Sequence, residues 1–471
     1  MNNIHEDSVD FQSNSQEEKQ QLSVQSVLSR GSQEEIKFIK GQAGHSDDEC
    51  STDLEDDIFT SSRRLNLSPS DVYLKACKQT GAVPVSYILC HLDDAILDLN
   101  YYGLGPLGAK ALAILLKSHG VVTHLELKGN SLQAEGTQYL MAMLFENISI
   151  QSLNLSDNKL GLKGAEVISK MLSDNRKLKS INLSENDFSD AAAKCLAEAL
   201  KNDFVVKELD LSYNCICDAG GEDLGVMLAE NIGIEVLNLS WNHFLIRGNA
   251  ALIAGLKVNA TLKQLQLSNS GFGRPEVQLM AEVLQQNDTL VLLDLSINCV
   301  DDEAVRLLCQ GLATNETLEV LKLSRNPITK IGATTLLRTV KNNMKSALKE
   351  IDISSVLVCE TFVELLEETR VTRPALRFQY YILPSVTKNL LALGIFKKFF
   401  EEQNKSIMDF FQALDKEGTM KVSTSAFRKA VKEANIPLDQ QQLGWLVRKF
   451  DKNCTATIVY RLVCKHTNSS T

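Results

Sequence analysis

Long apolar segments are missing from this 471-residue sequence. No run approaches the roughly 18 uncharged apolar residues of a membrane-spanning helix, so the sequence predicts no membrane span. The first residues, Met1 to Glu6, lack the basic patch and apolar stretch of a signal peptide, and we therefore expect no export. The 11 cysteines are scattered, without a Cys-x-x-Cys pair. These absences predict a cytoplasmic protein with reduced thiols.

Residue groupings typical of catalysis or metal binding are also absent. The seven histidines are dispersed, and none has a His-x-x-Glu-His or similar spacing. There is no Gly-x-Ser-x-Gly and no glycine-rich phosphate loop. Cys215 and Cys217, the tightest thiol pair, are interpreted as incidental, and His119 and His124 near Glu126 as a polar turn and strand edge. The sequence predicts no enzyme activity, no cofactor and no metal site.

The first 64 residues are acidic and poor in aromatic residues. They carry 14 acidic and 6 basic side chains, a net charge of −8, and contain no Trp or Tyr. Such a segment cannot bury enough apolar surface to offset the entropy of ordering it. Residues 1–64 are therefore predicted to be an acidic disordered tail.

A repeat of 28 residues dominates the middle of the chain. Its signature is two aliphatic residues separated by one position, followed three residues later by Asn. The paired positions begin at Leu97, Leu125, Leu153, Ile181, Leu209, Leu237, Leu265, Leu293, Leu321 and Ile351. Of the 20 paired positions, 17 are Leu and 3 are Ile, which excludes a chance pattern. The sequence predicts ten structural repeats.

Each part of the repeat predicts a local structure. Alternation places both leucines on one face of a short strand. The Asn that follows can hydrogen-bond backbone groups in the turn after the strand. A stretch with apolar spacings of three and four, such as Ala165, Ile168 and Leu172, predicts a helix. These helices tend to end in Asn, for example Asn147 and Asn231, which we expect in the left-handed conformation that stops a helix.

These motifs resemble the leucine-rich repeat family, in its ribonuclease-inhibitor-like class, over residues 94–370. The resemblance implies an α/β solenoid, a horseshoe with a parallel sheet on its concave side and helices on its convex side. A stack of repeats needs caps. Residues 65–93, where a helix should start at Ser68 and stop near Gly81, are predicted as the N-terminal cap, and 371–385 as a linker or C-terminal cap.

Residues 386–471 differ in composition, with 14 basic and 8 acidic side chains. Apolar helical segments precede loops beginning at Asp415 and Asp451, which resembles a pair of EF-hands. The sixth loop position should be Gly and the twelfth Glu. Here they are Met420 and Ala426 in the first loop, and Ala456 and Leu462 in the second. The sequence predicts a degenerate, EF-hand-like helical region that does not bind calcium.

The residue between the paired aliphatic positions should point outward on the concave face. This column contains five acidic residues and one basic residue: Asp98, Glu126, Asn154, Asn182, Asp210, Asn238, Gln266, Asp294, Lys322 and Asp352. The next column, mostly serine from Ser156 to Ser354, is expected to point outward too. Tyr101, Tyr213 and Trp241 should lie at a solvent-facing rim.

The predicted protein-binding residues are Asp98, Glu126, Asn154, Asn182, Asp210, Tyr213, Asn238, Trp241, Asp294 and Asp352. They favour a basic protein partner, whereas polarity alone could also reflect a solvated sheet. Residues 65–385 carry a net charge of −8, which argues against nucleic acid.

The sequence thus predicts a non-catalytic protein-interaction scaffold of undetermined oligomeric state. Two alternatives stay open. One is a GTPase-activating factor, since the Ran GTPase-activating protein is similar in its repeat class and acidic segment. The other is an inhibitor of a basic enzyme, by resemblance to ribonuclease inhibitor.

Overall fold

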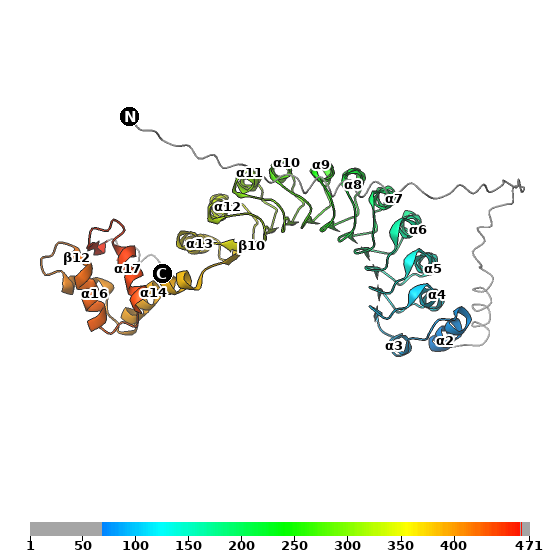
Figure 1. The fold of residues 1–471 in the computed structure, drawn as a ribbon, viewed down its shortest axis with the longest axis horizontal. Helices are drawn as coiled ribbons and strands as arrows, with labels where there is room; N and C mark the ends of the chain where they lie inside the picture. The colour runs from blue at the N-terminus through cyan, green and yellow to red at the C-terminus, as the bar shows by residue number, and fades with distance from the viewer. Residues whose placement is uncertain (1–67, 462, 464–471) are drawn as a thin grey trace, which may run out of the picture. The chain divides into compact units, whose positions relative to one another are not determined.

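The computed structural model describes residues 68–461 and 463. The acidic tail predicted at 1–64 lies outside the described residues. Short strands alternate with helices from β1 to β11, and a further group of helices with a two-stranded sheet follows (Figure 1). No described helix has the length and apolar character that a membrane crossing requires.

The elements have the following bounds. The strands are β1 (Ile96–Asp98), β2 (His124–Glu126), β3 (Ser152–Asn154), β4 (Ser180–Asn182), β5 (Glu208–Asp210), β6 (Val236–Asn238), β7 (Gln264–Gln266), β8 (Leu292–Asp294), β9 (Val320–Lys322), β10 (Glu350–Leu357), β11 (Arg377–Tyr381), β12 (Lys421–Ser423) and β13 (Thr457–Val459). The helices are α2 (Pro69–Thr80), α3 (Ser86–Cys90), α4 (Gly105–Leu116), α5 (Gln133–Glu146), α6 (Gly161–Ser173), α7 (Asp190–Leu200), α8 (Asp218–Glu230), α9 (Ile246–Val258), α10 (Arg274–Leu284), α11 (Asp302–Leu312), α12 (Lys330–Asn342), α13 (Glu360–Thr372), α14 (Pro384–Glu402), α15 (Ile407–Leu414), α16 (Thr424–Glu433) and α17 (Gln440–Phe450).

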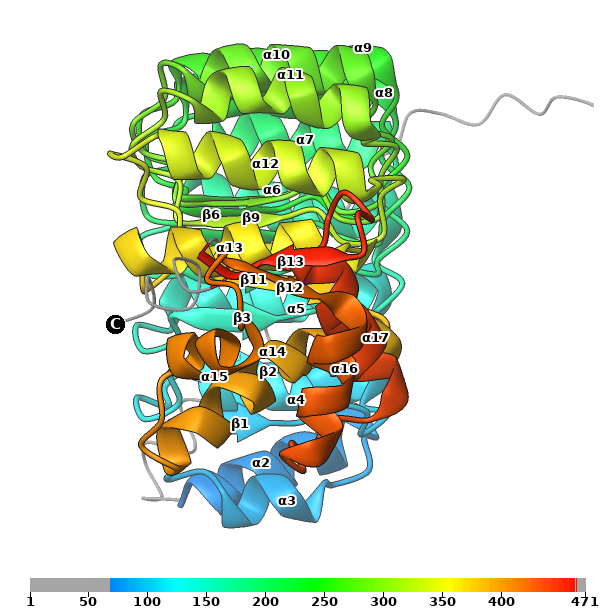
Figure 2. The same cartoon turned by 90° about the vertical axis from the view of Figure 1, so that its left-hand side faces the viewer.

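The strands β1 to β11 form one parallel sheet in which each strand pairs with the next along the chain. Leu97 lies opposite Leu125, and Leu293 lies opposite Leu321, so partners are one 28-residue repeat apart. The helices α4 to α13 lie along one side of this sheet (Figure 1), and the turned view looks along their stack (Figure 2). The predicted leucine-rich repeat solenoid is confirmed.

The alternation of side chains explains the layers. The paired leucines are fully buried under the sheet, as at Leu209 and Leu211, while the residue between them remains partly exposed. In α6 the buried residues include Ala165, Ile168 and Leu172, whose spacing brings one helical stripe onto the sheet. One apolar core therefore runs from the N-terminal cap to β11.

Buried asparagines join each repeat to its neighbours. Asn214 donates from Nδ2 to the carbonyl of Leu183 in the previous repeat, at 3.2 Å, and to that of Leu211 in its own, at 3.0 Å. Its Oδ1 accepts from the backbone N–H groups of Asn186 and Phe188, both at 3.0 Å. Similar bonds are made by Asn130, Asn158, Asn186, Asn242, Asn298 and Asn326. We call this series the asparagine ladder.

The ladder is interrupted in the seventh repeat, where Ser270 takes the place of Asn. The Ser270 hydroxyl donates only locally, to the Ser268 carbonyl at 3.3 Å. Buried Asn249 donates from Nδ2 to the Ser270 carbonyl at 2.7 Å. Within the described part of the chain, the Asn249 Oδ1 has no hydrogen-bond partner. Asn249 therefore replaces the missing Asn side chain at position 270 only in part.

The asparagines at the helix ends correct one prediction. Asn147, Asn231, Asn259 and Asn343 have φ between −68° and −83° and are extended, not left-handed. Asn231 Nδ2 donates to the carbonyls of Leu200 and Asp203 in the previous repeat, at 2.7 and 2.8 Å. The amide bridges neighbouring repeats, and this bridge, rather than a left-handed turn, explains the residue type.

Both ends of the solenoid carry additional elements. Ser68 caps α2 and Gly81 ends it with φ +74°, as the sequence predicts. At the other end, the segment 371–385 contributes β11, which pairs in parallel with β10. Phe378 of β11 and Phe362 of α13 are buried against each other, so this segment closes the core with a further strand.

The C-terminal region has a core of its own, centred on Phe396 of α14. The ring of Phe396 lies 5.8 Å from that of Phe427 in α16 and 6.1 Å from that of Phe450 in α17. The loops after α15 and α17 are joined by β12 and β13, where Val422 pairs with Ile458 in antiparallel register. The helix α14 thus fills the space between the other helices.

We expect Ser270→Asn to stabilise the protein by about 1 kcal/mol, the net contribution of a typical buried hydrogen bond, because it restores the asparagine ladder. The matched control, Asn298→Ser, should destabilise it by about 1–3 kcal/mol, since buried groups lose their partners. Urea unfolding followed by circular dichroism measures both. A midpoint for Ser270→Asn at or below that of wild type would contradict the prediction.

Candidate functional site

The residues predicted to bind a partner lie in two rows along the solenoid. The first row is the strand residue between the paired leucines, which we call the strand row. Parallel register places Asp210 opposite Asn182 on one side and Asn238 on the other. The structure therefore brings the predicted strand residues together as one continuous row along the uncovered face of the sheet.

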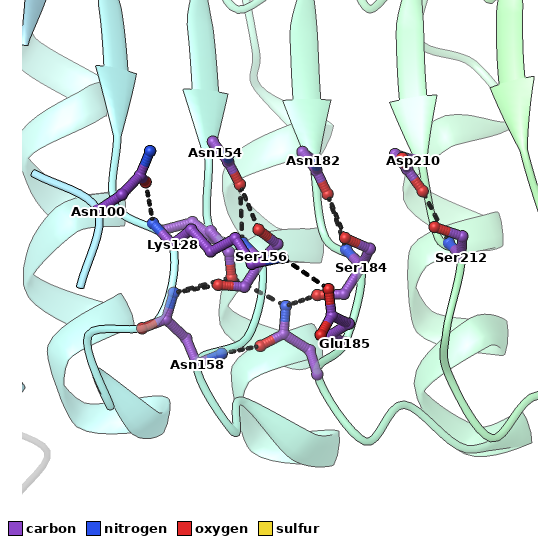
Figure 3. A network of polar contacts seen from close by, with 12 residues as sticks. Asn100, Lys128, Asn154, Ser156, Asn158, Asn182, Ser184, Glu185, Asp210 and Ser212 are labelled. Carbon is purple, nitrogen blue, oxygen red and sulfur yellow. Dashed lines mark hydrogen bonds and ion pairs between the residues drawn. The ribbon is translucent and has the colours of Figure 1, made fainter. Parts of the chain in front are cut away.

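Most Asp and Asn residues in the strand row also stabilise the backbone. Asp210 Oδ1 accepts a hydrogen bond from the backbone N–H of Ser212, two residues on, at 2.8 Å (Figure 3). The same bond is made by Asp98, Asn154, Asn182, Asn238, Asp294 and Asp352. Either side chain supplies this oxygen, so the bond explains why both Asp and Asn occur in the strand row.

Neighbours in the strand row partly compensate its charge. Asn154 donates to Glu126 at 2.7 Å, and Asn238 donates to Asp210 at 3.0 Å. Lys322 lies 3.8 Å from the Asp294 carboxylate. The row is therefore less negative toward a partner than its formal charge indicates.

The serine column is placed differently from the prediction. Ser156, Ser184, Ser212, Ser240 and Ser296 are buried, so these serines do not form an outward surface. Ser156 and Ser184 donate their hydroxyls to Asn154 and Asn182 at 2.8 Å (Figure 3). The chain begins to turn toward the helix two residues after the strand row, and the serine side chain is therefore buried below the rim row.

The second row, which we call the rim row, is the residue just before each ladder position. All its members from the first to the ninth repeat have a left-handed φ of 51–69°: Tyr101, Gly129, Asp157, Glu185, Tyr213, Trp241, Asn269, Ile297 and Arg325. Glycine and asparagine adopt this conformation readily, whereas bulky side chains do so at a cost. The aromatic residues and Ile297 are therefore the unusual members of this row.

Tyr213 and Trp241 form a pair at the centre of the rim row. Their rings are stacked, with centroids 5.1 Å apart and planes 10° from parallel. Tyr213 is 51% exposed and Trp241 37%. Tyr101 lies apart from this pair, because its ring covers Gly129, where an added Cβ would come within 2.3 Å of it. The structure thus joins two of the three predicted aromatic residues.

The side chain of Lys128 reaches along the rim row to the residue next to the aromatic pair. The amine of Lys128 lies 2.8 Å from the Glu185 carboxylate, two repeats away (Figure 3). This hydrogen bond raises the pKa of Lys128 above its usual range. Glu185 directly precedes Tyr213 in the rim row, so the carboxylate next to the aromatic pair already holds an amine.

Sequence reasoning missed a third row, the first residue of each strand. Val236, Leu292 and Val320 are partly exposed there, beside Glu208, which is exposed. Alternation places the residues before and after a buried leucine on the same face, so this row could have been identified from the sequence. It adds apolar contact area to the otherwise polar sheet face.

A separate apolar surface lies where the convex helices end. Phe145, Ile148, Phe204 and Ile232 are more than half exposed. A shallow hollow is lined by Phe145, Ile148 and Arg176 among others. Ile148, Phe204 and Ile232 occupy the same position of the 28-residue repeat, directly after Asn147, Asp203 and Asn231, so the repeat register could have identified them.

The first carboxylate of each C-terminal loop accepts hydrogen bonds from other residues of the C-terminal region. Asp415 accepts hydrogen bonds from the backbone N–H and hydroxyl of Thr419 and from the Tyr460 hydroxyl. Burial opposes ionisation of Asp415, but these bonds outweigh it and lower its pKa. Asp451 accepts from Thr455 in the same way, and these bonds lower its pKa as well. Each leading carboxylate thus binds donors of its own loop.

Thiols and potential metal ligands are dispersed in the described part of the chain. Nine cysteines there are free, among them Cys215 and Cys217. Across residues 68–461 and 463, no three His, Cys, Asp or Glu side chains are arranged to hold a metal ion. His119 is half-buried, and burial lowers its pKa.

Comparisons with known proteins agree with this architecture. Residues 146–169, 174–197, 203–225 and 314–337 match the family described as "Leucine Rich repeat". With the parallel repeat structure, these matches support a leucine-rich repeat protein. The solved structure titled "Leiomodin-1 Actin-Binding Site 2 (ABS2)" is similar over 30% of this chain and 86% of that chain, at 24% identity and a TM-score of 0.27. Similarity at this score says nothing of what this chain binds.

Asp210→Asn should lower the free energy of unfolding by no more than about 0.5 kcal/mol, because the amide oxygen can accept the Ser212 N–H bond and only the part-buried bond from Asn238 is lost. Asp210→Ala should cost about 1 kcal/mol, since that N–H loses its partner. Urea unfolding of the two variants side by side tests this. Equal losses in both would show that the charge, rather than the bond, stabilises the strand.

Proposed function

We propose that this chain is a non-catalytic scaffold that binds a protein partner on the uncovered face of its sheet and the adjoining rim row. The single observation that carries the proposal is the exposed Tyr213–Trp241 stack at the centre of a continuous parallel sheet. Exposed aromatic residues are typical anchors of protein interfaces. A long open surface also suits a folded partner better than a small substrate, which needs an enclosed site.

The charge of this face favours a basic partner. The strand row has five carboxylates and one lysine, and Asp157 and Glu185 precede the aromatic pair in the rim row. A surface of this sign attracts a basic protein and repels the phosphates of nucleic acid.

The alternatives have less support. No arginine of the chain can be matched to a catalytic arginine of a GTPase-activating factor. Inhibition of a basic enzyme would use the same face and chemistry, so it is a special case of the scaffold proposal. We place the protein in the cytoplasm, and the order of its segments resembles the leucine-rich repeat-containing protein 74 group.

For the C-terminal region we propose an EF-hand-like pair that packs internally. Its helices surround Phe396 and Phe400 of α14, as a groove encloses a bound helix. Trp445 of α17 donates to Glu360 of α13 at 2.7 Å, and Lys449 pairs with Glu364. These contacts favour a role in closing the end of the solenoid rather than in binding calcium.

We expect calorimetry to detect no calcium binding to the full chain below about 10 µM, the range of sensor sites. The double variant Met420→Gly, Ala426→Glu should gain measurable affinity, because it restores the turn residue and the bidentate ligand of the first loop. Tight binding by the wild type would refute the calcium-independent assignment.

Affinity capture from native lysate tests the sheet face as a binding site. The variant Asp210→Asn, Trp241→Ala, Asp294→Asn removes two charges and one aromatic anchor while Asn retains the backbone bonds. The control Glu166→Gln, Leu279→Ala, Glu282→Gln makes the same kinds of change on exposed helix positions. We expect a basic protein to be retained by wild type and control and to be reduced at least ten-fold by the sheet variant. Identical capture by all three proteins would reject the proposed site.

A further inference from the structure

We propose that the Tyr213–Trp241 stack, together with the nearby carboxylates of Asp157 and Asp187, is a binding site for an arginine side chain of the protein partner. This inference rests on the proposed function and specifies the chemistry that the partner must present. A planar guanidinium can stack on aromatic rings and pair with carboxylates at the same time.

The pair shares its left-handed backbone with the rest of the rim row and differs from it in carrying two exposed, stacked aromatic rings. Tyr213 and Trp241 have φ values of 55° and 57°, in the region that bulky side chains rarely occupy. Their exposure means that core packing does not repay this cost. Stacking covers one face of each ring, and the exposed fractions of 51% for Tyr213 and 37% for Trp241 leave part of each residue accessible to a ligand.

The charge beside the stack is complementary to a cation. Between Asp157 and Ile297, the rim row contains two carboxylates, the aromatic pair and no lysine or arginine. Neighbouring strands are about 4.8 Å apart, which places Glu185 beside Tyr213 and Asp157 one strand further. Asp187, two residues after Glu185, is exposed. Among the residues that the structure describes, the carboxylates of Asp157 and Asp187 have neither a hydrogen bond nor an ion pair.

Lys128 provides an internal example of a cation that pairs with a carboxylate of the rim row. Its amine crosses a full repeat to reach Glu185 at 2.8 Å, at the position next to the aromatic pair. Glu185 is therefore already shared, and the available negative charge is that of Asp157 and Asp187. Under this proposal the guanidinium lies against Tyr213 and is attracted by the negative charge of these two carboxylates, which belong to the two preceding repeats.

Tryptophan fluorescence offers a direct test, because the chain has two tryptophans and only Trp241 is substantially exposed. The test uses the full chain with Trp445→Phe, so that Trp241 supplies the whole signal. The probes are blocked glycine–serine peptides of equal length that carry two arginines, two lysines, two citrullines or two glutamates. Citrulline retains the planar shape of arginine without its charge.

We expect the arginine peptide to change the Trp241 emission and to bind at least about five-fold more tightly than the citrulline and lysine peptides. Tyr213→Ala and the double variant Asp157→Asn, Asp187→Asn should each weaken it about five-fold or more. Tyr213→Phe, which retains the stacked ring, and Glu166→Gln, on a convex helix, should bind as the parent does.

Equal binding of the arginine and citrulline peptides, a preference for lysine or glutamate, or no response at all would overturn the inference. So would full affinity in Tyr213→Ala, whose fold is checked by circular dichroism. These outcomes leave the scaffold proposal standing if the sheet variant loses its captured partner. If capture is unchanged, the scaffold proposal fails by that result, whatever the peptides do.

Discussion

The structure depends on the buried side-chain amides that join most repeats to their neighbours. At the end of every strand the chain turns away from the sheet and leaves backbone carbonyls under the rim, where water cannot reach them. Asn214 satisfies one such carbonyl in its own repeat and another in the preceding repeat. Because unpaired buried carbonyls are costly, the amide fixes the distance between repeats as well as the turn.

This constraint determines how the exposed face is built. Once the ladder holds each turn at the same level, equivalent residues of successive strands must lie opposite one another. The Asp and Asn residues of the strand row then hold the backbone N–H groups that follow them. Their polarity is therefore explained by local structure before any partner is considered. Positions that depart from the repeat, such as Tyr213 and Trp241, carry more information about recognition.

The sequence allowed the strands, the pitch of 28 residues and the helix between Ser68 and Gly81 to be predicted, because each depends on short-range alternation or on local capping residues. It was less informative where a side chain acts across repeats. Asn231 ends its helix as predicted, but it does so with an extended rather than a left-handed backbone, and its amide bridges to the previous repeat. The serines were expected to point outward, yet Ser184 and Ser212 are buried because the turn has already begun.

The site could be predicted only in part for the same reason. Alternation correctly placed Asp210 in an outward row, but it could not show that Tyr213 and Trp241 would stack, since that depends on the lateral distance between repeats. Nor could it show that Lys128 would reach Glu185 across 57 residues of sequence. Contacts between residues one or two repeats apart are decided by the ladder, which brings distant segments to within a strand spacing.

The C-terminal region bears on where a partner can bind. Phe396 and Phe400 of its own helix α14 are buried in its core, and side chains that are already buried offer little apolar area to another chain. Trp445, 6% exposed, is hydrogen-bonded to Glu360 of α13 and is not an accessible anchor. By contrast, Tyr213 is 51% exposed and Trp241 is 37% exposed. Since binding requires surface that folding has not already used, the balance of available contacts favours the sheet and its rim row over the C-terminal helices.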